Sequence, residues 1–70
     1  MKELFAALCV ARKTGDYADA DRLRGIIEGR LDARLAYRPN GRITVSRGDV
    51  PLGYYDEVRD TLLLRGLGEP

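Results

Sequence analysis

The sequence predicts a small α+β fold in which two helices are followed by a β-hairpin and then by a third helix. Apolar residues recur at helical spacing through the first half of the chain, and again near its C-terminal end. Between these parts, apolar and polar residues alternate on both sides of the turn signal "PNG" at 39–41. We therefore expect one domain over residues 1–70, with the architecture ααββα.

A helical hairpin is expected in the N-terminal half of the chain. The first helix should cover about residues 2–13, where Phe5 and Leu8 begin an apolar face. Gly15 suits the left-handed position that ends a helix, and Asp16 suits the cap that begins the next one. Because only a short turn joins the two helices, they should pack against each other in antiparallel orientation.

The second helix is expected over about residues 16–32. Its apolar residues share one face of the helix, namely Ala20, Leu23, Ile27 and Leu31. Gly25 and Gly29 lie on the opposite face. Their spacing could let another chain approach the helix closely, or the two residues could simply weaken the helix, since each glycine costs about 1 kcal/mol relative to alanine. Both interpretations stay open.

The stretch "RLAYRPNGRITVSR", residues 34–47, predicts a β-hairpin whose register depends on the loop. A two-residue "NG" turn would pair Arg38 with Ile43 and would mix apolar and polar residues on both faces. A three-residue "PNG" loop would pair Tyr37 with Ile43 and would separate the two kinds of residue. One face would then hold Leu35, Tyr37, Ile43 and Val45, and the other Arg34, Ala36, Arg38, Arg42, Thr44 and Ser46. We therefore predict the three-residue loop.

The segment "YYDEVRDTLLLRG" predicts a third helix over about residues 54–65, and Gly66 would end it. Its inner face would be formed by Tyr54, Tyr55, Val58 and Leu62. A connector that contains glycine and proline, residues 46–53, separates this helix from the hairpin.

The sequence contains no set of residues typical of an enzyme. It has no histidine, and Cys9 is the single cysteine, so a Cys/His metal site and an activated thiol are both excluded. We expect no cofactor and no metal, and we interpret Cys9 as a small buried hydrophobe. The lone cysteine and the lack of a membrane-length apolar run favour a cytoplasmic protein. Residues 47–49 spell Arg-Gly-Asp, a known cell-adhesion tripeptide, and we attribute this match to chance.

Arginine side chains on the predicted hairpin are the strongest candidate binding site. The candidates are Arg34, Arg38, Arg42 and Arg47. In the three-residue register Arg38 and Arg42 face each other across the strands, and like charges in that position are destabilising. Such a pair could serve an anionic partner, or both guanidinium groups could extend into water beside the turn. The net charge of +1, from 12 basic and 11 acidic residues, argues against a dedicated nucleic-acid-binding domain.

The stretch "DYADADRLRGII", residues 16–27, resembles two known helical elements. One is the helix in the C-terminal extension of cysteinyl-tRNA synthetases, where an aromatic residue is followed by Ala-Asp and then by Leu/Ile-Arg-Asp. The matching residues are Tyr17, Ala20, Asp21, Leu23 and Arg24, and Gly25 stands where aspartate is usual. The other is the UVR-type helical hairpin of nucleotide excision repair proteins. The resemblance implies a helical hairpin used for macromolecular contact and nothing catalytic.

These observations favour a small non-enzymatic interaction protein, an adaptor or inhibitor that binds an acidic macromolecular surface through the arginine-bearing hairpin. Such a protein would suit a phage or a mobile element. One alternative is a winged-helix-like DNA-binding accessory protein, although the acidic residues at 16, 19 and 21 would repel phosphate. Another alternative is a structural subunit of a larger assembly, with Gly25 and Gly29 at an interface. A homodimer would supply burial that a chain of 70 residues has difficulty providing alone.

Overall fold

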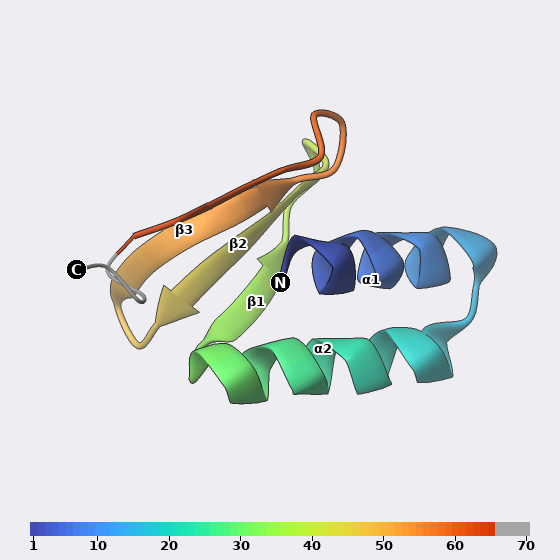
Figure 1. The fold of residues 1–70 in the computed structure, drawn as a ribbon, viewed down its shortest axis with the longest axis horizontal. Helices are drawn as coiled ribbons and strands as arrows, with labels where there is room; N and C mark the ends of the chain where they lie inside the picture. Colours follow the sequence, from blue (N-terminus) through green and yellow to red (C-terminus); the bar gives the residue numbers. More distant parts are fainter. Residues whose placement is uncertain (66–70) are drawn as a thin grey trace.

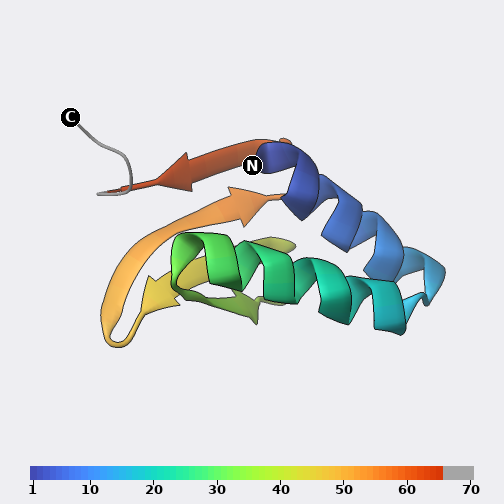
Figure 2. The same cartoon turned by 60° about the horizontal axis from the view of Figure 1, so that its bottom comes forward.

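The computed structural model of the protein describes residues 1–65, which form two helices followed by a four-stranded antiparallel sheet. The elements are α1 (Lys2–Thr14), α2 (Tyr17–Leu31), β1 (Arg34–Tyr37), β2 (Arg42–Arg47), β3 (Val50–Asp56) and β4 (Thr61–Leu64). Each strand pairs with the next one along the chain, so the order in the sheet is β1-β2-β3-β4. The two helices run antiparallel beside each other on one side of the sheet (Figure 1, Figure 2).

The predicted helical hairpin is confirmed together with both of its caps. Gly15 ends α1 with a φ of 80°, which L-residues with side chains rarely adopt. At the start of α2 the Asp16 carboxylate accepts the N–H of Asp19 at 3.2 Å. The buried residues of α2 are the four expected from its spacing, Ala20, Leu23, Ile27 and Leu31. Local sequence signals therefore determine where α1 ends and where α2 begins.

The three-residue loop of the hairpin is also confirmed. Tyr37 lies opposite Ile43, as this register requires. The Arg38 N–H donates to the Arg42 carbonyl at 2.8 Å and closes the loop, in which Gly41 has a φ of 84°. The apolar face of the hairpin turns toward the helices, and its most deeply buried members are Leu35, Ile43 and Val45. Burial of one face thus determines the register.

The prediction of a third helix over residues 54–65 is wrong, and the fold is ααββββ instead of ααββα. After the hairpin the chain continues as β3, turns at 57–60 and returns as β4. The Asp56 carboxylate makes this turn, because it accepts the N–H groups of Val58 at 3.0 Å and Arg59 at 3.3 Å. Asp60 follows with a left-handed φ of 50°, which a helix interior excludes. Val58, expected on an inner helix face, is 84% exposed at the turn.

The core lies between the helices and one face of the sheet. Phe5 of α1 and Tyr55 of β3 stack with ring centroids 5.3 Å apart, and both are almost completely buried. Strand residues that alternate with the buried ones point to the opposite side of the sheet. We call this side the open face, and its residues include Arg34, Ala36, Arg38, Arg42, Thr44, Ser46, Pro51, Tyr54, Leu63 and Arg65. No described helix packs on the open face (Figure 2).

Candidate binding surface on the open face of the sheet

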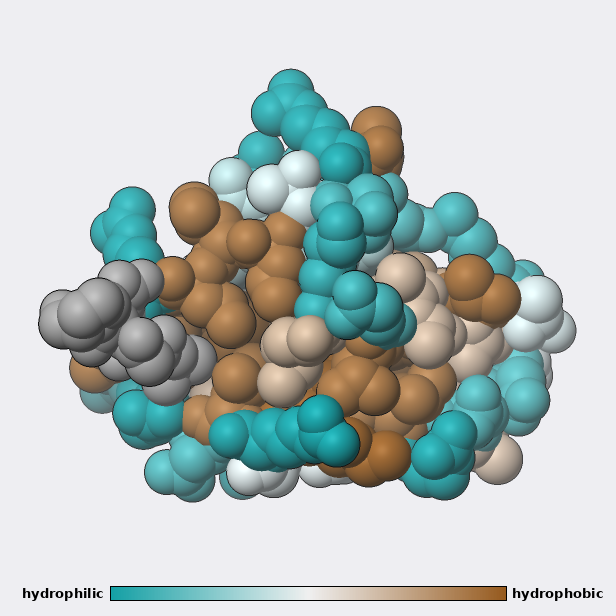
Figure 3. Space-filling view, viewed as in Figure 1, coloured by the Kyte–Doolittle hydropathy of each residue, from teal (hydrophilic) through white to brown (hydrophobic). Residues whose placement is uncertain are grey.

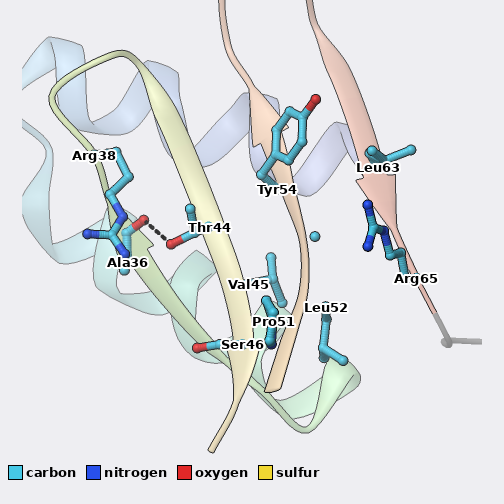
Figure 4. Close-up of a pocket in the computed structure, with 11 residues that line it drawn as sticks. Ala36, Arg38, Thr44, Val45, Ser46, Pro51, Leu52, Tyr54, Leu63 and Arg65 are labelled. Atoms are coloured by element: carbon cyan, nitrogen blue, oxygen red, sulfur yellow. Dashed lines mark hydrogen bonds between the residues drawn. The ribbon is translucent and has the colours of Figure 1, made fainter. Parts of the chain in front are cut away.

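A hollow of about 390 Å³ lies on the open face (Figure 4). Arg38, which follows β1, borders the hollow on one side, and Leu63 and Arg65 border it on the other (Figure 4). The hydroxyl groups of Thr44 and Ser46 come from β2, between these two sides. The hollow therefore combines two cations, two hydroxyl groups and apolar surface, a mixture that can bind a ligand with both charged and apolar groups.

An irregularity in β3 shapes the hollow. The pairing of β2 with β3 shifts between Val45 and Ser46, so that Leu52 has no partner of its own on β2. An extra residue of this kind bends a strand. Gly53 follows with a φ of 154° and presents no side chain to the neighbouring β4. The missing side chain lets β4 approach β3 closely, and Leu52 and Gly53 both line the hollow at this irregularity.

Arg42, one of the predicted site residues, makes contacts within the chain. Its Nε atom lies 3.6 Å from the Asp56 carboxylate, whose residue is buried. Its guanidinium carbon lies 4.5 Å from the centre of the Tyr54 ring. Asp56 thus neutralises Arg42. Of the two arginines expected to face each other, only Arg38 has no ion-pair partner among residues 1–65.

Arg47, another predicted site residue, caps a helix. Its guanidinium group donates to the Asp32 carbonyl at 2.8 Å and to the Leu31 carbonyl at 2.7 Å. These carbonyls end α2 and have no partner within the helix. A cation at the C-terminal end of a helix also interacts favourably with the helix dipole. The contacts of Arg47 are therefore explained by folding.

Arg34 and Arg38 remain exposed, and neither has an ion-pair partner among residues 1–65. The structure adds Arg65, which was not among the predicted site residues because residues 54–65 were expected to form a helix. Side chains two residues apart along an extended chain point to the same side, so Arg65 lies on the open face with Leu63. Arg38 and Arg65 thus border one hollow although they are far apart in the sequence (Figure 4).

Gly25 and Gly29 lie on the exposed face of α2, away from the hollow. A Cβ atom at either position would meet no other atom within 4 Å. No described part of the chain therefore requires glycine there, and the hypothesis of an interface at these residues stays a prediction.

Two further ionisable groups, Cys9 and Tyr55, are buried in the core. Burial raises the pKa of the Cys9 thiol, which packs within the core. Burial, aided by the Asp60 carboxylate, also raises the pKa of Tyr55, whose hydroxyl donates to Asp60 at 2.7 Å. Among residues 1–65 no three histidine, cysteine, aspartate or glutamate side chains gather as a metal site. None of the helices in this part of the chain is long and apolar enough to cross a membrane.

Comparisons with protein-family models, with curated proteins and with solved structures give no match to this chain.

Proposed function

We propose that this protein is a non-enzymatic binding protein that holds an acidic segment of a protein partner on its open face. The observation that carries the proposal is that Arg38 and Arg65 border the same hollow. Neither residue has an ion-pair partner in the described part of the chain. Carboxylates from another molecule would complement these two guanidinium groups, each with a charge-assisted hydrogen bond.

An acidic protein segment suits this surface better than a nucleic acid does. Single-stranded nucleic acids are typically bound by several stacking aromatic residues along a basic groove. Tyr54 is the only aromatic residue among the described residues that line the hollow, and Arg42 already lies against its ring. Because Arg42 and Arg47 make internal contacts, few cations remain for phosphate groups.

The remaining surface of the hollow indicates what kind of acidic segment would bind. Leu63 is 47% exposed, and Pro51 lies exposed on the same face. The Ser46 hydroxyl can donate to, or accept from, a peptide backbone, and the Thr44 hydroxyl, which donates to the Ala36 carbonyl at 3.4 Å, can still accept. A segment in which acidic and apolar residues alternate would place carboxylates at Arg38 and Arg65 and an apolar side chain against Leu63.

A titration monitored by NMR tests the proposal. The ¹⁵N-labelled protein is mixed with a peptide of alternating glutamate and leucine, with the same peptide carrying glutamine for glutamate, and with oligothymidylate. We expect the glutamate peptide to shift the amide signals of Thr44, Ser46 and Leu63. The double variant R38E/R65E should bind this peptide at least about tenfold more weakly, which is ~1.4 kcal/mol.

The matched control is the double variant R30E/R59E, which changes the net charge equally but alters exposed residues outside the hollow. An equal loss of affinity in both double variants would show only a general charge effect and would overturn the proposal. Absence of binding by the glutamate peptide would also contradict it. Salt-dependent binding of oligothymidylate in its place would favour the nucleic-acid alternative.

A further inference from the structure

The two edges of the sheet differ in how their backbone groups are satisfied. At the β1 edge, the Leu35 N–H donates to the Glu28 carboxylate at 3.0 Å. The Leu35 carbonyl accepts from Arg24 at 3.1 Å. Glu28 and Arg24 also pair with each other on α2. The helix thus covers the outward-facing peptide groups of Leu35, which is one way in which proteins protect an edge strand.

The β4 edge has no such protection from the described residues. The Arg65 N–H donates to the Leu52 carbonyl, so residues 61, 63 and 65 direct their peptide groups toward β3. The peptide groups of Leu62 and Leu64 consequently point away from the sheet. No described residue bonds to them, and the strand "TLLL" contains no charged residue. An uncharged apolar edge with unpaired peptide groups is a ready template for another strand.

We propose that β4 pairs in antiparallel orientation with β4 of a second copy of this chain, about a two-fold axis at Leu63. In this register Leu62 of each copy lies opposite Leu64 of the other, and the two pairs exchange four backbone hydrogen bonds. The result is a continuous sheet with four strands from each copy. The contact is isologous, so it forms a dimer and not a longer chain, and at each β1 edge the peptide groups of Leu35 stay covered by α2.

A second copy fits this edge because the edge is complementary to itself. All three facing pairs in the proposed register are leucine against leucine. Leu62 and Leu64 are only half-buried beside the core, and Leu63 is 47% exposed on the open face. Figure 3 shows apolar surface on the left half of the view, where Figure 1 has the strands. Strand pairing would cover apolar surface that a chain of this size has few other means to bury.

The proposed contact is small. A strand of four residues buries less than the roughly 1,600 Å² of a standard stable interface. We therefore expect a dimer that dissociates on dilution, with a dissociation constant on the order of micromolar. The pairing does not depend on the proposed acidic partner. Because Leu63 and Arg65 border the hollow, however, it would bring the hollows of two copies close to the same axis.

Replacing Leu63, which lies on the proposed two-fold axis, by residues of either charge tests this register. Sedimentation velocity should show concentration-dependent dimers of the unaltered protein and monomers of L63K and of L63E, because like charges directly opposite each other are destabilising. An equimolar mixture of L63K and L63E should dimerise again. V58K, which replaces an apolar residue that is 84% exposed at the β3–β4 turn, should dimerise like the unaltered chain.

A backbone substitution tests the hydrogen bonds without altering any side chain. N-methylation of Leu64, introduced by chemical synthesis, removes an N–H that points away from β3. The matched control is N-methylation of Tyr37, whose N–H points outward at the β1 edge. Methylation at Leu64 should weaken dimerisation at least tenfold, and methylation at Tyr37 should not. A monomeric unaltered protein at millimolar concentration, or no recovery in the L63K and L63E mixture, would overturn the proposal.

Discussion

Gly53 lies directly against the backbone of Leu63, so that a Cβ atom built on residue 53 would overlap the Leu63 carbonyl oxygen. The φ of Gly53 is 154°, in a region that residues with side chains rarely adopt. This contact joins β3 to β4 beside the bulge at Leu52. A glycine is therefore required at this position for two reasons, its conformation and the close approach of the neighbouring strand.

We expect Gly53→Ala to lower the free energy of unfolding by more than ~2 kcal/mol, because either β4 must move or the backbone must change conformation. Urea unfolding measures this change. Gly25→Ala is the matched control, since the same methyl group enters a helix where no atom lies within 4 Å. The control should raise the free energy of unfolding by up to about 1 kcal/mol. Equal stability of Gly53→Ala and the unaltered protein would contradict the observed packing.

The helical hairpin and the β-hairpin could be predicted from the sequence because their signals are local. Gly15 and Asp16 lie within one turn, and "PNG" lies between the two strands that it joins. The second half of the sheet was missed because Tyr55, Val58 and Leu62 happen to recur at helical spacing. The turn between β3 and β4 also lacks glycine and proline, and the Asp56 carboxylate, which accepts two backbone N–H groups there, is a weaker signal in the sequence.

The candidate site was predicted only in part, for a different physical reason. Alternation along a strand places arginine side chains on a face, as it did for Arg34 and Arg38. Alternation does not reveal that Arg47 bonds to carbonyls at the end of α2, or that Asp56 neutralises Arg42, because these contacts join parts of the chain that are distant in sequence. Arg65 could be placed on the open face only after its segment was known to be a strand.

The cap that Arg47 provides to α2 predicts a loss of stability on truncation. Arg47→Ala leaves the Leu31 and Asp32 carbonyls without their side-chain donor and should lower the free energy of unfolding by about 1–2 kcal/mol. Arg34→Ala removes an exposed arginine with no ion-pair partner among residues 1–65 and should change stability by less than ~0.5 kcal/mol. Urea unfolding of both variants measures whether the capping arginine contributes more stability than the exposed one. Equal effects would show that the guanidinium of Arg47 does not cap the helix in solution.

The contact of Glu28 with the edge strand predicts a pH dependence of stability. Burial raises the pKa of Glu28, but hydrogen bonds from the Leu35 N–H and from Arg24 outweigh this effect and hold the pKa below its ordinary value. Because the folded protein binds this proton less tightly than the unfolded chain, the carboxylate contributes stability above the ordinary glutamate pKa of about 4.3. That contribution is lost as the pH falls through the lower, folded-state pKa.

Glu28→Gln should therefore lower the free energy of unfolding by about 1–2 kcal/mol at pH 7, because its neutral amide forms weaker hydrogen bonds with Arg24 and the Leu35 N–H. The difference from the unaltered protein should shrink as the pH falls from the ordinary glutamate pKa through the lower pKa of the folded state, because the carboxylate then becomes protonated. Urea unfolding between pH 3 and pH 7 measures both effects. Asp21→Asn, which removes an exposed acidic group elsewhere on α2, is the control and should cost less than ~0.5 kcal/mol. A difference between Glu28→Gln and the unaltered protein that stayed constant with pH would show that the charge of Glu28 does not support the β1 edge.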